Sequence, residues 1–206
     1  MTEVFLTAFA MLFVMIDPIG VAPLFATLTP GATLKRRIAI AARGVLIGGV
    51  LLFLFGLAGD ATLRAIGISV PAFRIAGGLM LFLLAVDMLF EKRGERRRQQ
   101  ADAEAEAEDP SVFPLATPLI AGPGSLTAMI LLTAEWEGDS SAAIAVYGAL
   151  FAVLLITFIL LIATDLIERA LGETGIKVLT RLFGMLLGAL AVQFVLDGVK
   201  NYLASF

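Results

Sequence analysis

Two short motifs hold the residues best placed to do chemistry, and both lie inside long apolar stretches. The first is Asp17–Gly20 (Asp-Pro-Ile-Gly) and the second is Ala121–Ser125 (Ala-Gly-Pro-Gly-Ser). Proline lacks an amide hydrogen and clashes with the carbonyl four residues back, so it frees backbone acceptors in a helix. Glycine permits the dihedral angles of an unwound stretch and lets a ligand approach the main chain. Each motif therefore predicts a break in an apolar helix; the prolines concerned are Pro18, Pro23, Pro118 and Pro123.

The two breaks together favour a small zwitterionic ligand. The half-helix after each break begins with free amides, which suit a carboxylate. The half-helix before each break ends in carbonyls, which suit an ammonium group or a cation. The alternative is that two proline-kinked helices merely pack together. The candidate ligand-binding residues are Ile16, Asp17, Pro18, Gly20, Ala121, Gly122, Pro123, Gly124, Ser125 and Thr127.

Asp17 stands beside the first break, where an ionised carboxylate near mid-bilayer costs about 2.5–3.5 kcal/mol or more. Acids inside a membrane usually face a cavity and mark the path of an ion, a proton or a substrate. Asp17 is therefore the candidate for proton coupling or for contact with a ligand amine. Capping the following half-helix is the structural alternative. Arg43 is expected to extend to the cytoplasmic surface rather than to pair with Asp17.

The composition indicates an integral membrane protein. Of the 206 residues, 59% are hydrophobic and 16% are charged, and the mean hydropathy is +0.95. Six segments have roughly the 20 apolar residues that cross a ~30 Å hydrocarbon core. They are expected near residues 4–28, 38–59, 72–90, 112–133, 142–164 and 178–199. The sequence thus predicts an all-α protein with six transmembrane helices, of which the first and the fourth are discontinuous.

An internal repeat relates the two halves. A shift of 105 places superposes Pro18 on Pro123, and the same shift superposes Asp60, Arg64 and Gly67 on Asp165, Arg169 and Gly172. Three spans per copy is an odd number, so the second copy enters the membrane from the opposite side. The halves are therefore expected to form two inverted three-helix repeats, 1–90 and 111–206, joined by a charged cytoplasmic linker, 91–110.

The basic residues predict the orientation. Eleven lie in the loops expected after spans 1, 3 and 5, whereas Arg64, Arg74 and Lys200 lie on the other side. Because basic loops stay in the cytoplasm, both termini are expected outside. The linker is basic in its first half and acidic in its second, which favours a solvated connection over binding to anionic lipid or nucleic acid.

The stretches Phe13–Phe25 and Pro114–Ser125 resemble the MarC family of bacterial and archaeal inner-membrane proteins. The resemblance covers essentially the whole chain. It implies a transporter of small neutral amino acids such as glycine and alanine, coupled to protons, in the cytoplasmic membrane. It also implies functional positions, which are Asp17, Pro18, Gly20, Pro118, Gly122, Pro123, Gly124 and Ser125.

Three functions are compatible with the residues. A secondary transporter would use the repeat, the paired breaks and Asp17. A channel, or an exporter of another small polar solute, could use the same architecture. An enzyme is not expected, because the chain has no histidine or cysteine and Asp17 is the main ionisable group inside a span. For the same reason neither a metal site nor a cofactor is expected.

Overall fold

The computed structural model describes residues 1–90, 99, 109–135 and 138–204. Every regular element in these ranges is a helix, as the sequence predicts, and they contain no strand. The first half consists of α1 (Thr2–Ile16), α2 (Pro18–Leu28), α3 (Leu34–Ala65) and α4 (Val70–Leu89). The second half consists of η1 (Ser111–Ile120), α6 (Pro123–Glu135), α7 (Ser140–Ile162) and α8 (Thr164–Leu203). Nearly all of the charged linker expected at 91–110 lies outside the described residues.

Five helical stretches of the described chain are long and apolar enough to cross a membrane. They are Thr2–Leu28, Leu34–Gly59, Val70–Leu89, Ser140–Ile162 and Arg169–Leu203. The pair η1 and α6, bent by 55° at its break, supplies a sixth if it is counted as one span. These stretches coincide with the six segments expected from hydropathy. The protein is therefore an all-helical membrane protein with five or six candidate spans.

Polar side chains begin three of the long helices. Thr33 accepts from the Arg36 amide at the start of α3, and Ser69 accepts from the Ala72 amide at the start of α4. Asp139 accepts from two amides at the start of α7. Each residue satisfies donors that the first helical turn leaves unpaired. These caps fix where the chain turns back into the bundle.

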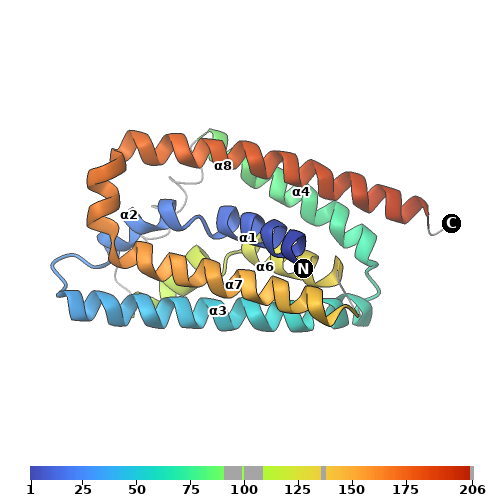
Figure 1. The fold of residues 1–206 in the computed structure, drawn as a ribbon, viewed down its shortest axis with the longest axis horizontal. Helices are drawn as coiled ribbons and strands as arrows, with labels where there is room; N and C mark the ends of the chain where they lie inside the picture. The colour runs from blue at the N-terminus through green and yellow to red at the C-terminus, as the bar shows by residue number, and fades with distance from the viewer. Residues whose placement is uncertain (91–98, 100–108, 136–137, 205–206) are drawn as a thin grey trace.

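The start of α8 differs from the expected structure. The sequence predicts a loop before a last span at 178–199, but the chain is helical from Thr164 and turns at Gly172, where φ is 62°. In Figure 1 the first part of α8, in orange, stands across one end of the bundle before the long part begins. Ile167 in this part is buried. The segment stays helical because one face packs inward, although its charged residues lower the hydropathy that the prediction used.

The helices pack in pairs that match between the two halves. In one direction, α1 lies against α7 and α2 contacts α8. In the other direction, η1 and α6 lie against α3, and α6 contacts α4. The remaining large interface joins α4 to α8, which run side by side in Figure 1. The first span of one half thus contacts the second and third spans of the other half, in both directions.

The first span forms the centre of the molecule. In Figure 1, α1 and α6 lie between the α4–α8 pair and the α3–α7 pair. The most apolar window of Thr2–Leu28 is 56% buried, against 28% to 39% for the other four long candidates. By contrast, large apolar side chains on the outer helices are exposed, as expected of surfaces that contact lipid; examples are Leu46, Leu83, Phe151 and Leu186.

Candidate functional site

The first break consists of a single residue, Asp17, between α1 and α2. Its φ and ψ are 54° and 63°, the left-handed conformation that Asp and Asn adopt more readily than other non-glycine residues. The Asp17 amide still donates to the Phe13 carbonyl at 2.9 Å, which ends α1. Pro18 is the first residue of α2, where its missing amide leaves no partner unpaired. The chain therefore changes helices at one point without unwinding further.

The Asp17 side chain caps the helix that follows. One carboxylate oxygen accepts from the Gly20 amide at 3.1 Å, and only 2% of the residue is exposed. A Cβ on residue 20 would collide with this carboxylate, so a larger residue there would force the Asp17 side chain to move. The capping interpretation of Asp17 is thus satisfied geometrically. A second role in transport is compatible with this geometry, because a carboxylate can accept more than one hydrogen bond.

The second break is longer and lies between η1 and α6. Phe113 and Thr117, the residues before two prolines of η1, have extended dihedral angles inside the helical segment. A residue before proline is driven out of the helical region by the proline ring, so η1 is irregular throughout. Pro123 then begins α6. The carbonyls of these broken turns no longer face helix amides, so they need hydrogen-bond donors from elsewhere.

Ser125 supplies one of those donors. Its hydroxyl lies 2.7 Å from the Ile120 carbonyl and 3.0 Å from the Gly122 carbonyl. The buried hydroxyl is therefore already engaged in hydrogen bonding to carbonyls of its own break. It can donate to a ligand only if these bonds open. Thr127, two residues further along α6, is buried against Gly77 of α4, whose added Cβ would lie 3.0 Å from the threonine methyl.

The two breaks lie close together at the centre of the fold. A Cβ on Gly124 would be 3.4 Å from the sulfur of Met15, two residues before Asp17, and 2.8 Å from Leu84 of α4. α1 and α6 also contact each other. Among the predicted residues, Ile16, Asp17, Pro18, Ala121, Ser125 and Thr127 are buried, Gly20, Gly122 and Gly124 are partly buried, and Pro123 is exposed.

Arg43 pairs with a carboxylate other than Asp17, and 63% of its side chain is exposed. Its guanidinium pairs with Asp109 at 2.6 Å, just before η1. The same carboxylate accepts from the amide of Ser111 at 3.0 Å and from its hydroxyl at 2.5 Å. The hydrogen bonds from Ser111, then Arg43, hold the pKa of Asp109 below its ordinary value. The pair thus joins α3 to the start of the second half.

Sequence reasoning missed three polar contacts between the halves. Thr164, buried at the start of α8, donates to the Ala22 carbonyl of α2 at 3.3 Å. Arg37 contacts Asp165 at 3.3 Å and stacks on the Phe25 ring. Arg74, buried in α4, lies 3.8 Å from Glu135. No local pattern joins these positions, because each contact links residues far apart in the chain.

The described residues contain no group of three or more acidic side chains placed to hold a metal ion. The polar groups at the breaks are instead one carboxylate, one or two hydroxyls, helix amides and the carbonyls of η1. Such groups can hold and release a small polar molecule by hydrogen bonds alone.

Comparison with known proteins assigns the chain to a family. The profile of the MarC family of integral membrane proteins matches residues 2–203. A UPF0056 membrane protein of Methanocaldococcus jannaschii, MJ1677, is 36% identical and the match covers 98% of each chain. The UPF0056 inner membrane protein YhgN of Escherichia coli is 32% identical, over 96% of this chain and 97% of its own. No solved structure matches the chain. The chain therefore belongs to the MarC family of integral membrane proteins.

Proposed function

We propose that this protein is a secondary transporter of small neutral amino acids, of the glycine and alanine class, that is coupled to protons. The observation that carries the proposal is the contact between the two breaks, made by Gly124 and Met15. Paired discontinuous helices that meet near mid-membrane are typical of transporter sites. The substrate class comes from the resemblance to the family.

The two halves are proposed to form an inverted repeat. Matched interfaces support this: α1 with α7 and η1 with α3, and likewise α2 with α8 and α6 with α4. A two-fold axis between the halves would generate this pattern, and it would map the α4–α8 interface onto itself. Gly67 and Gly172, which superpose at a shift of 105, also share positive φ angles of 76° and 62°. Alternating access would then be a rocking of one half against the other.

The proposed site is electrostatically unequal at its two ends. The shift of 105 superposes Asp17 on Gly122, so the first half carries a carboxylate where the second half has no side chain. The Gly20 amide of α2 is satisfied by Asp17. The residue before α6 has no side chain that could accept from its first amides, so these suit the carboxylate of a ligand. Asp17 and the carbonyls of η1 suit the ammonium group.

Proton coupling is assigned to Asp17. It is the buried acid at the break, and a ligand ammonium and a proton would compete for the same carboxylate. Binding and release of both would then be linked in one transport cycle. The E. coli relative is called an inner membrane protein, which supports a cytoplasmic-membrane location for this chain. We infer a transport role rather than an enzymatic one, without a cofactor or a metal ion.

The decisive experiment is uptake of labelled glycine and alanine by proteoliposomes, with and without an imposed pH gradient. Saturable uptake that the gradient drives above equilibrium is expected. Uptake that is linear with concentration and unaffected by the gradient would indicate a channel. No uptake of either amino acid, with folded protein in the vesicles, would refute the proposed substrate class.

A further inference from the structure

Arg74 is a buried cation with little to neutralise it. It lies one turn into α4, and only 8% of its side chain is exposed. Within the described part of the chain, its Nε is buried without a hydrogen-bond partner. The ion pair found there is with Glu135, at 3.8 Å from Nη2 to the carboxylate, which is longer than a hydrogen bond. A guanidinium carries five donors, and buried donors without acceptors are rare in stable structures.

Two other arginine–carboxylate pairs have shorter distances. Arg43 lies 2.6 Å from Asp109, and Arg37 places one nitrogen 3.3 Å from both oxygens of Asp165, although Nε and Nη2 of Arg37 are buried without a partner in the described part of the chain. The contact of Arg74 with Glu135 is looser than either, although Arg74 is the more deeply buried. Glu135 is 34% exposed and ends α6, so solvent reaches the carboxylate side of the pair. As a structural tie the pair is poor, because a buried charge is stabilising only when its donors are satisfied.

Arg74 lies at the end of a packed seam that leads to the proposed site. Along the seam, Arg74 faces Glu135, Gly77 faces Thr127 and Leu131, and Leu84 faces Gly124. Glu135 is eleven residues beyond Gly124, which corresponds to about 16 Å along α6. A Cβ on Gly77 would lie 2.9 Å from Leu131, so the seam is closed in this structure. α4 belongs to the first half and α6 to the second, so a rocking motion would open the seam.

We propose that Arg74 is a second carboxylate-binding site, at the mouth of the α4–α6 seam, where an arriving ligand displaces Glu135. The ligand class is a small carboxylate, and the amino acid of the proposed function is the physiological example. The further claim that Arg74 stands at an entrance to the central site rests on that proposed function. The exchange is chemically balanced, because one carboxylate replaces another on the same guanidinium. Release of Glu135 removes one contact that holds α6 to α4.

The test uses sodium acetate as a minimal carboxylate, acetamide as its neutral counterpart, and glycine. Thermal unfolding of the purified protein is measured against concentration of each at constant ionic strength. Acetate and glycine are expected to stabilise the wild type and acetamide is not. Arg74→Gln is expected to raise the half-maximal concentration of acetate about tenfold or more, since hydrogen bonds to charged groups have that effect. Glu135→Gln removes the competing carboxylate and is expected to lower that concentration severalfold.

Arg43→Gln is the matched control, because it removes an arginine–carboxylate pair on another helix, α3, and no change in the acetate response is expected. If acetate stabilised the wild type and Glu135→Gln no more than acetamide does, the proposal would be overturned. This comparison holds even if Arg74→Gln fails to fold. These measurements do not require transport. Failure of glycine uptake by the wild type would refute the proposed function, whereas loss of the Arg74-dependent acetate effect would refute this site.

Discussion

Asp17 combines a backbone role and a side-chain role in one residue. Its left-handed dihedral angles let the chain pass from α1 to α2 in one step, and its carboxylate receives the Gly20 amide. Asn tolerates the same dihedral angles and is about equal to Asp as a cap. The two residues differ in charge and proton exchange. Substitution by Asn therefore separates the structural role from the transport role.

We predict that Asp17→Asn inserts and unfolds like the wild type but loses gradient-driven accumulation of glycine or alanine. Asp17→Ala is expected to lower the free energy of unfolding by about 1–3 kcal/mol, because it loses the cap and strains the left-handed residue. Uptake at several pH values, with thermal unfolding in detergent, measures both effects. If Asp17→Asn accumulated the amino acid normally, the role of Asp17 would be limited to capping α2.

Asp109 provides a prediction outside the spans. Its pKa is lowered from 3.8, first by the Ser111 hydroxyl, so its charged form is favoured in the folded protein. A group with a depressed pKa stabilises the fold fully above its unfolded value, and that contribution is lost as the pH falls through the folded value. We therefore predict that the wild type unfolds at a higher temperature than Asp109→Asn at pH 7. The difference should shrink as the pH drops below 3.8, and a constant difference would contradict the prediction.

At the scale of helices, sequence patterns predicted the spans well because the bilayer imposes a length and a hydropathy on each of them. Pro and Gly located the ends of α1 and η1 for a local reason, the loss of an amide or a Cβ. The helical start of α8, the partner of Arg43 and the inward hydroxyl of Ser125 were not predictable in this way. The first two depend on neighbours that only the folded chain brings near, and the third depends on the exact shape of the break, which places the Ile120 and Gly122 carbonyls beside the hydroxyl.

Close packing of α4 on α8 gives a prediction at this scale. A Cβ on Gly78 would lie 2.8 Å from the Ala191 carbonyl oxygen, a backbone atom that cannot rotate away. Gly78→Ala is expected to separate the helices and lower the free energy of unfolding by about 1–3 kcal/mol. Gly188→Ala is the control at the same interface, because its Cβ would meet Ala85 at 3.7 Å. Similar thermal unfolding of the two variants would show that the interface is not tightly constrained.

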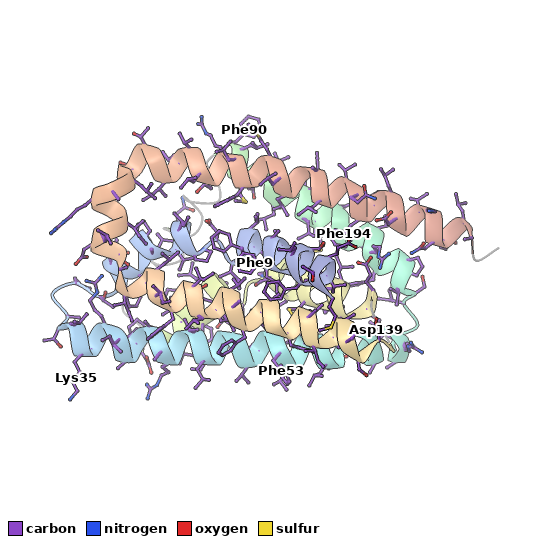
Figure 2. All side chains as sticks on the ribbon, in the orientation of Figure 1. Phe9, Lys35, Phe53, Phe90, Asp139 and Phe194 are labelled. Atoms are coloured by element: carbon purple, nitrogen blue, oxygen red, sulfur yellow. The ribbon has the colours of Figure 1, made fainter. Side chains whose placement is uncertain are left out.

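At the scale of the whole molecule, the turns of the bundle divide between two ends. Figure 2 shows Lys35 at one end and Asp139 at the other, and Figure 1 places both termini at the end of Asp139. The sequence assigns eleven basic residues to the side of Lys35 and three to the other side, although five of the eleven, between 92 and 98, lie outside the described residues. Arg74 and Glu135 lie at the end of the termini, because they stand at the start of α4 and the end of α6. The orientation in the membrane therefore also decides which side would admit a carboxylate to Arg74.

We predict that the Lys35 end faces the cytoplasm and that Asp139 and both termini face outward, because basic loops are retained inside. The chain has no cysteine, so single cysteines report position without a background. Lys35→Cys and Ser140→Cys are suitable because both residues are exposed in turns or first helical turns. In intact cells an impermeant maleimide is expected to label Cys at 140, and at 35 only after permeabilisation. The reverse pattern would invert the topology and would place the mouth of the α4–α6 seam in the cytoplasm.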